Sequence, residues 1–229
     1  MTPEALAERI LYRDADVLVL DKPAGLAVHQ APGAGPNLEK LLPALAFGLK
    51  QPPALAHRLD RDTSGCLVLG RHPPALRRLM ALFAAGQVEK TYWAVVEGAP
   101  PAAEGIVDQP ILKVHRGREW RMVVDAAGQR ALTRWRLLGQ GDGRSWLELS
   151  PETGRTHQIR VHCAWFGCPV VGDAAHGARP GVGERLHLHA RRVSFVLDPK
   201  RPPIEAVAAP PLHMGPALAA CGFVDSRAR

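Results

Sequence analysis

A dense group of charged side chains lies directly before a short apolar segment, and this feature most constrains the fold. The group spans residues 57–65 and holds two carboxylates, two guanidiniums and an imidazole. The apolar residues 66–69 follow at once and predict a short, buried strand. A loop anchored on such a strand is held rigidly, as a catalytic carboxylate requires. A solvated turn before a strand would give the same pattern, so the residues alone leave both interpretations open.

The composition is that of an ordinary globular protein. Hydrophobic residues make up 46% of the 229 residues and charged residues 22%, which is typical of a folded domain. No apolar run approaches the roughly 18 residues of a membrane-spanning helix, and the N-terminus lacks a basic region followed by an apolar one. The four cysteines show no disulfide-rich spacing. We therefore expect a cytoplasmic protein with reduced thiols.

Positive charge is in excess along the chain. The formal net charge is +7, and most of the basic residues are arginines. Arginine suits two-point contacts with phosphates and stacking on bases. The excess favours a polyanionic partner, but it does not choose among RNA, DNA and a membrane surface.

Strand-like segments and occasional helices follow one another along the chain. Strands are predicted at residues 11–20 with a turn at 13–16, at 66–69, 90–96, 146–149 and 192–197, and in pieces across 106–138. Helices are predicted at 38–49, at 74–85 and, capped by Thr156, at 157–166. Residues 100–105 are the best candidate for a hinge between two lobes, and no element is predicted after Pro199. The mixture predicts an α+β sheet protein and not a βαβ winding.

Several segments carry a resemblance to one enzyme family. Residues 57–65, HRLDRDTSG, resemble the signature of the RluA family of RNA pseudouridine synthases, in which HRLD, two variable residues and TSG surround a catalytic aspartate. Further segments match motifs of this family in the expected order: LDKPAGL at 20–26, KTY at 90–92, GRTHQIRVH at 154–162, GD at 172–173 and RLHLHA at 185–190. The resemblance covers about residues 10 to 200.

The resemblance implies a fold and a reaction. The fold would be a mixed, mainly antiparallel central sheet in two lobes, approximately residues 1–100 and 101–229, flanked by helices and loops, with a cleft between the lobes. Residues 1–229 would form a single catalytic domain. It would convert specific uridines of large-subunit ribosomal RNA or transfer RNA to pseudouridine without a cofactor or metal. We expect an RNA stem-loop as partner, a monomer, and no binding to DNA or membranes.

Three residues are the catalytic candidates that the resemblance implies. Asp60 would act as a nucleophile on the ribose or as a base, and the sequence does not decide between these chemistries. Tyr92 would stack on the uracil, and its hydroxyl could take part in proton transfer. Arg160 would pair with Asp60 and keep it ionised. Arg155 is the rival for this role, but its place before the predicted helix suits a phosphate better.

Other residues are candidates for contacts with RNA. Arg58 would enter the space that the flipped base leaves, which offsets part of the cost of flipping. His57 is expected to hold the loop by hydrogen bonds, and Lys90 to support Tyr92. The remaining candidates for RNA or base contacts are Arg61, Thr63, Arg155, His157 and Gln158. The arginines expected to contact phosphates include Arg77, Arg78, Arg116, Arg118 and Arg121.

The chain also departs from the family. After Gly172 and Asp173 the family usually has an aromatic residue before glycine, whereas this chain has His176 before Gly177. The short N-terminal segment leaves no room for an accessory RNA-binding domain, so recognition would rest on the catalytic domain.

Two rival functions stay open. One is a non-catalytic RNA-binding protein that kept the fold. The other is a metal-dependent nuclease or glycosidase that uses Asp60 and Asp62, although the spacing of the histidines and cysteines is a weak match to zinc sites.

Overall fold

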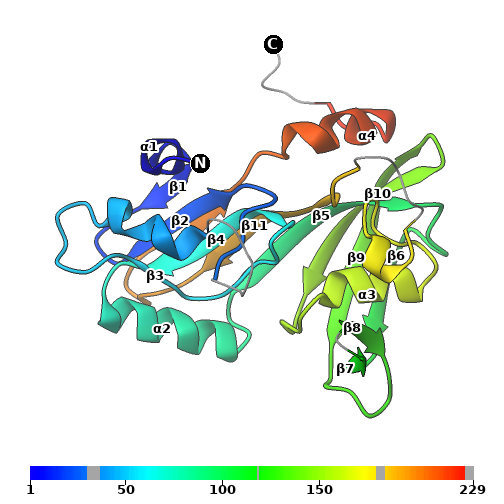
Figure 1. The fold of residues 1–229 in the computed structure, drawn as a ribbon, viewed down its shortest axis with the longest axis horizontal. Coiled ribbons are helices and arrows are strands. Elements are labelled where there is room, and N and C mark those ends of the chain that lie inside the picture. Colours follow the sequence, from blue (N-terminus) through cyan, green and yellow to red (C-terminus); the bar gives the residue numbers. More distant parts are fainter. Residues whose placement is uncertain (30–36, 118, 179–183, 225–229) are drawn as a thin grey trace. The chain divides into compact units, whose positions relative to one another are not determined.

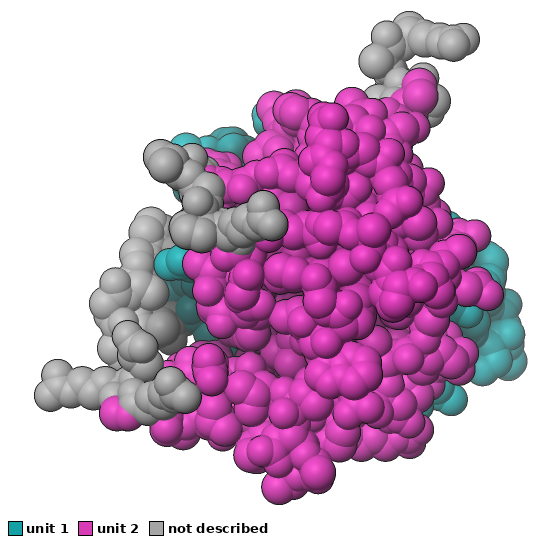
Figure 2. Space-filling view, turned by 90° about the vertical axis from the view of Figure 1, so that its right-hand side faces the viewer, with its two compact units in different colours: residues 1–90, 190–209 teal, residues 91–189, 210–229 magenta. Residues whose placement is uncertain are grey.

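The computed structural model describes residues 1–29, 37–117, 119–178 and 184–224 (Figure 1). The chain forms two compact units, which Figure 2 colours separately. Unit 1 comprises residues 1–90 and 190–209, and unit 2 comprises residues 91–189 and 210–229. This division differs from the predicted lobes of about 1–100 and 101–229. The first boundary falls inside a strand ahead of the expected hinge, and residues 190–209 return to unit 1 because they pair with its strands.

Unit 1 is built on strands in the order β1-β2-β4-β11, with β3 added to β4 and β12 to β11. The pairings between β1 and β2, β2 and β4, β3 and β4, and β11 and β12 are antiparallel. The strands are β1 (Ile10–Arg13), β2 (Val17–Lys22), β3 (Ala54–Leu55), β4 (Ser64–Gly70), β11 (Leu188–Phe195) and β12 (Ile204–Val207). The helices are α1 (Pro3–Ala7), η1 (Leu38–Lys40), η2 (Leu42–Leu45) and α2 (Pro73–Ala84).

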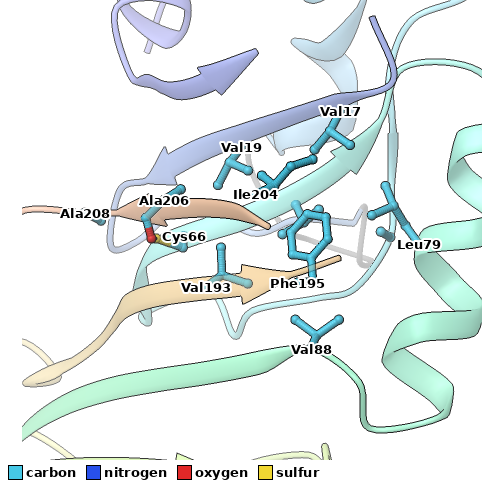
Figure 3. Packing of buried hydrophobic residues seen from close by; sticks show 12 residues of the cluster. Val17, Val19, Cys66, Leu79, Val88, Val193, Phe195, Ile204, Ala206 and Ala208 are labelled. Atoms are coloured by element: carbon cyan, nitrogen blue, oxygen red, sulfur yellow. The ribbon is translucent and has the colours of Figure 1, made fainter. Parts of the chain in front are cut away.

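The core of unit 1 explains why these segments become strands. Every residue of β4 is buried, as are the first four of β2, so the apolar runs 17–20 and 66–69 are continuous and do not alternate. Figure 3 shows Leu79 of α2 pointing toward Phe195 of β11, with Val17 of β2 nearby. Packing of α2 against these strands holds β4, the strand that follows Asp60, in a fixed position.

Unit 2 contains the antiparallel order β5-β10-β9-β6 and a separate hairpin of β7 and β8. The strands are β5 (Glu89–Glu97), β6 (Glu104–Asp108), β7 (Ile111–Arg116), β8 (Glu119–Val124), β9 (Leu132–Gly141) and β10 (Arg144–Pro151). The helices are α3 (Gln158–Trp165), η3 (Ala174–His176), η4 (Leu212–Met214) and α4 (Gly215–Ala220). The helix α3 packs its apolar residues Ile159 and Cys163 into a core with Leu147 and Leu149 of β10.

The predicted α+β class with a mainly antiparallel sheet is confirmed. Two element predictions are wrong. Residues 38–49 form two short 3-10 helices and not one α-helix, because Pro43 has no N–H to continue a helical ladder. The tail after Pro199 contains β12, η4 and α4, and β12 forms because pairing with β11 buries Ile204 and Ala206. Within the described ranges, no helix is long and apolar enough to cross a membrane.

Candidate active site

Asp60 lies in a tight turn of unit 1 between β3 and β4. The Thr63 N–H donates to the Asp60 carbonyl oxygen at 3.2 Å, which closes the turn. Leu59 and Thr63 are buried, whereas Arg58 and Arg61 are exposed and Asp60 is half-buried. The turn therefore rests on buried side chains and presents its two arginines to solvent. Asp62 pairs with Arg61 at the surface at 3.2 Å, as expected for a turn residue.

The buried side chain of Lys22 holds this turn by hydrogen bonds to backbone carbonyl oxygens. Its side chain is fully buried, and Nζ donates to the carbonyl oxygens of Pro23, Leu26 and Arg61, each at 2.9 Å. The Gly25 N–H donates to the same Arg61 oxygen at 2.9 Å. Burial lowers the pKa of Lys22 to about 8, and the charges of Asp62 and Asp60 oppose that shift. Lys22 was absent from the predicted site residues, although the DKPAG motif that contains it signalled its importance.

His57 has the structural role expected of it. The Val68 N–H donates to its Nε2 at 3.0 Å, and its ring stacks on Phe83 with centroids 4.3 Å apart. Burial lowers the pKa of His57 to about 3, with a further contribution from the Lys90 charge. The imidazole is therefore neutral at pH 7 and is no acid there.

The structure shows why a glycine follows Thr63 and Ser64 at position 65. Its φ is +104°, and a Cβ placed there would lie 2.2 Å from the carbonyl oxygen of Ala190. Only glycine lets β4 pass so close to β11 at this point.

Tyr92 and Lys90 both lie on β5, as predicted. Tyr92 is half-buried, pairs in register with Leu149 of β10 and packs against the core of unit 2. Lys90 is also half-buried, and burial lowers its pKa.

The entry to α3 differs from the prediction. His157, not Thr156, is the N-cap, in a left-handed conformation with φ of +54°, and its side chain makes no capping hydrogen bond. The Gln158 side chain instead holds the segment that leads into the helix. Its Oε1 accepts from the Thr153 hydroxyl at 2.7 Å and from the Arg155 N–H at 3.0 Å.

The amide of Gln158 also ties α3 to β9. Its Nε2 donates to the Leu132 carbonyl oxygen and to the Thr133 hydroxyl, both at 2.9 Å. The Gln158 side chain is buried and both ends of its amide are engaged within unit 2, which gives it an internal role, and its predicted RNA contact stays a prediction. Arg155 is exposed before the helix, as expected, and its Nε donates to the Arg130 carbonyl oxygen at 3.0 Å.

Arg160 projects from α3 onto Asp173, a pairing that the sequence reading missed. Nε donates to Oδ2 and Nη2 to Oδ1, both at 2.7 Å. The Asp173 side chain is 0% exposed and that of Arg160 12%. Burial alone would raise the pKa of Asp173, but the hydrogen bonds from Arg160 and His176 outweigh it and hold the pKa well below its usual range. The pairing of Arg160 with Asp60 stays a prediction.

The aromatic rings near α3 form a short series. The His157 ring lies 5.1 Å from the His176 ring and 5.4 Å from the Trp120 ring of β8. The Lys113 ammonium of β7 lies 4.5 Å from the centroid of Trp120, which is 44% exposed. This side of unit 2 thus offers an exposed aromatic ring with a cation beside it.

The predicted phosphate-binding arginines differ in their surroundings. Arg77 and Arg78 lie on α2 and are exposed, and Arg78 donates to Asp16 at 3.2 Å, which takes up part of its charge. Arg121 lies on β8, whereas Arg118 lies outside the described residues. Across the described part of the chain, no group of three or more His, Cys, Asp or Glu side chains is arranged to hold a metal ion.

Comparisons with known proteins point to one family. A family model described as RNA pseudouridylate synthase matches residues 16–165. A Zymomonas mobilis protein called an uncharacterized RNA pseudouridine synthase is 46% identical over 200 residues, which cover 86% of this chain and 91% of the relative. Another protein of that organism, named ribosomal large subunit pseudouridine synthase D, is 34% identical over 213 residues, which cover 85% of this chain and 66% of the relative. The solved structure of human RNA pseudouridylate synthase domain containing 4 gives a TM-score of 0.81 at 28% identity, covering 96% of this chain and 95% of that one.

Proposed function

The chain belongs to the RNA pseudouridylate synthase family and is a pseudouridine synthase, an isomerase, and on this premise we propose that Asp60 is its catalytic carboxylate. The reaction breaks the bond from ribose C1′ to uracil N1 and makes a bond from C1′ to uracil C5; the C5 hydrogen leaves as a proton, and N1 takes up a proton. A carboxylate can serve as nucleophile at C1′ or as base at the ribose. The ribosyl group moves within one nucleotide and no net oxidation takes place, so the proposed reaction needs no cofactor.

The placement of Asp60 is the observation that carries this proposal. The Thr63 N–H donates to the Asp60 carbonyl oxygen, and the Lys22 ammonium donates to the carbonyl oxygen of the next residue, Arg61. Such fixation from two sides limits the positions that the carboxylate can take, and a fixed carboxylate loses little entropy on meeting its substrate. The Lys22 charge also interacts favourably with Asp60.

Tyr92 and Arg160 complete the proposed chemistry. Tyr92 would stack on the uracil, and its hydroxyl would take part in proton transfer, which typically contributes ~10²–10⁴-fold to a rate. Arg160 would stabilise the charge of Asp60. The bidentate contact with Asp173 supports this role, because it fixes the plane of the guanidinium.

We propose a stem-loop of ribosomal or transfer RNA as substrate. One relative is named a ribosomal large subunit pseudouridine synthase, which supports the ribosomal choice. The net charge of +7 and the exposed Arg58 and Arg61 suit a polyanion. Trp120 with Lys113 beside it suits a base that has lost its stacking partners.

Substitution of Asp60 tests the proposal. Tritium release from RNA labelled at uracil C5 measures isomerisation, because the reaction frees that hydrogen. Asp60→Asn and Asp60→Ala should abolish release while RNA binding survives, since neither an amide nor a methyl group can replace the carboxylate as nucleophile or base. Asp62→Asn is the matched control and should keep most of the activity, because Asp62 pairs with Arg61 at the surface. Substantial turnover by Asp60→Asn would refute the assignment.

A further inference from the structure

Arg160 is held by a buried pair of side chains that lie beyond α3 in the sequence. Asp173 presents both carboxylate oxygens to it, at 2.7 Å each, and His176 donates from Nδ1 to the same carboxylate at 3.0 Å from each oxygen. The His176 side chain is 5% exposed and that of Asp173 is 0% exposed. A carboxylate accepts only, so the Nδ1 atom of His176 must carry the proton of that contact.

The backbone around Asp173 leaves the carboxylate little freedom. Gly172 has φ of +78°, and a Cβ there would lie 2.2 Å from the Arg185 carbonyl oxygen. The Asp173 N–H donates to Val170, and its carbonyl oxygen accepts from the N–H groups of His176 and Ala178. The turn η3 thus folds His176 back over the carboxylate of Asp173.

The geometry of the pair assigns a direction to the guanidinium. The contacts with Asp173 use Nε and Nη2, which form one edge of the planar group, and Nη1 is not part of them. Two parallel hydrogen bonds fix the plane as well as the position of an arginine. A single contact would leave the group free to rotate about its axis.

His176 changes how the negative charge of Asp173 is shared. A carboxylate that served Arg160 alone would neutralise much of its positive charge. Because His176 donates to both carboxylate oxygens, its N–H dipole offsets part of the negative charge of Asp173. The electrostatic potential at Arg160 is therefore more positive than with Asp173 alone. Arg160 therefore keeps its attraction for a second anion.

We propose that Asp173 and His176 are positioning residues that orient Arg160 and preserve its charge for the catalytic carboxylate. This inference rests on the proposed function of Asp60 and Arg160. It predicts that both residues act on the chemical step through Arg160 and not on RNA binding.

Substitutions at His176 test the inference without removing the buried charge. His176→Phe keeps an aromatic ring and loses the Nδ1 donor. His176→Asn places an amide N–H near the position of Nδ1, and His176→Gln places one near Nε2. The single-turnover rate at saturating RNA should fall about 10–100-fold in His176→Phe, as expected for one lost hydrogen bond to a charged group. His176→Asn should recover most of that loss relative to His176→Gln.

Asp173→Asn tests the other member of the pair. It should lower the single-turnover rate about 100-fold, a size typical of a slightly misplaced reacting group. The RNA dissociation constant should stay near that of the wild type. His213→Phe is the matched control and should leave the rate unchanged, since it removes a contact of a ring nitrogen with the Leu186 carbonyl oxygen elsewhere in unit 2.

A double-mutant cycle separates positioning from a structural role. If His176 acts through Arg160, then His176→Phe should have no further effect on the rate of Arg160→Met. Additive losses, or variants with a lower melting temperature but a wild-type single-turnover rate, would overturn the inference and leave Asp60 untouched. Failure of the proposed function would show separately, as turnover by Asp60→Asn.

Discussion

Lys22 shows how one buried charge can fix a loop that is distant in sequence. Its ammonium replaces three waters with three carbonyl oxygens, one of them from Arg61, the residue after Asp60. The lowered pKa of Lys22 reports the cost of burying this charge, and the hydrogen bonds offset that cost. Stability and the position of Asp60 therefore depend on the same side chain.

We predict that Lys22→Met destabilises the protein by about 2–4 kcal/mol, because buried carbonyls that lose their partner keep their desolvation cost. Relief from burying a charge opposes this loss, and the Arg61 carbonyl oxygen keeps its hydrogen bond from the Gly25 N–H, so the total stays below the cost of three unsatisfied carbonyls. Urea unfolding measures the change. Lys200→Met is the control and should lie within experimental error of the wild type, since Lys200 is exposed. Equal stability of both variants would contradict the role of Lys22.

His57 gives a pH dependence with a defined sign. Its pKa is about 3 in the folded protein against 6.5 for a free histidine, because its ring is buried. Below pH 6.5 the unfolded chain takes up a proton that the folded chain does not, so the contribution of His57 to stability is complete above pH 6.5 and declines as the pH falls toward 3. We predict that the wild type loses more stability between pH 7 and pH 4.5 than His57→Gln, which does not titrate.

Chemical unfolding at several pH values measures this difference. His57→Gln keeps an acceptor near the position of Nε2, so the Val68 N–H retains a partner and the other titrating groups cancel in the comparison. Parallel stability curves for the two proteins would show that His57 does not titrate as its burial requires.

Elements with one dominant signal were predictable from the sequence. The apolar runs of β2 and β4 and the helical spacing of Leu76 and Leu79 in α2 led to correct elements. The tail was missed because β12 is only a short segment whose stability comes from its partner β11, and local sequence does not report a distant partner. Tertiary pairing decided the structure where local propensity was weak.

The hairpin of β7 and β8 is the element whose proposed role in RNA binding is most easily tested. We predict that Trp120→Ala weakens RNA binding about 5–100-fold, because stacking of a base on an aromatic side chain is worth ~1–3 kcal/mol. Trp165→Ala is the matched control, since Trp165 is an exposed tryptophan of the same unit, at the end of α3, with 52% of its surface accessible against 44% for Trp120. Fluorescence anisotropy of a labelled stem-loop measures both, and equal affinities would exclude Trp120 from the interface.

Across the whole molecule, the family of the chain was easier to predict from the sequence than the contacts within its site. The motif around Asp60 was sufficient for the family, because its residues are contiguous. The partner of Arg160 was not predictable, since Asp173 reaches it only through the path of the chain at Gly172. Likewise, the internal role of Gln158 depends on β9, which lies far from it in sequence.

The last prediction concerns what the whole molecule reads in RNA. A base is cheapest to flip from a loop, where stacking partners are already lost, so a stem-loop should be modified faster than the same sequence locked in a full duplex. Affinity should come mainly from phosphate contacts by arginines, and five neutralised phosphates would give a log–log slope against salt of roughly −3.5 to −4.5. Binding between low and physiological ionic strength, with single-turnover rates on both RNAs, measures these quantities. A duplex modified as fast as the loop, or binding that ignores salt, would contradict this account of recognition even if Asp60 is catalytic.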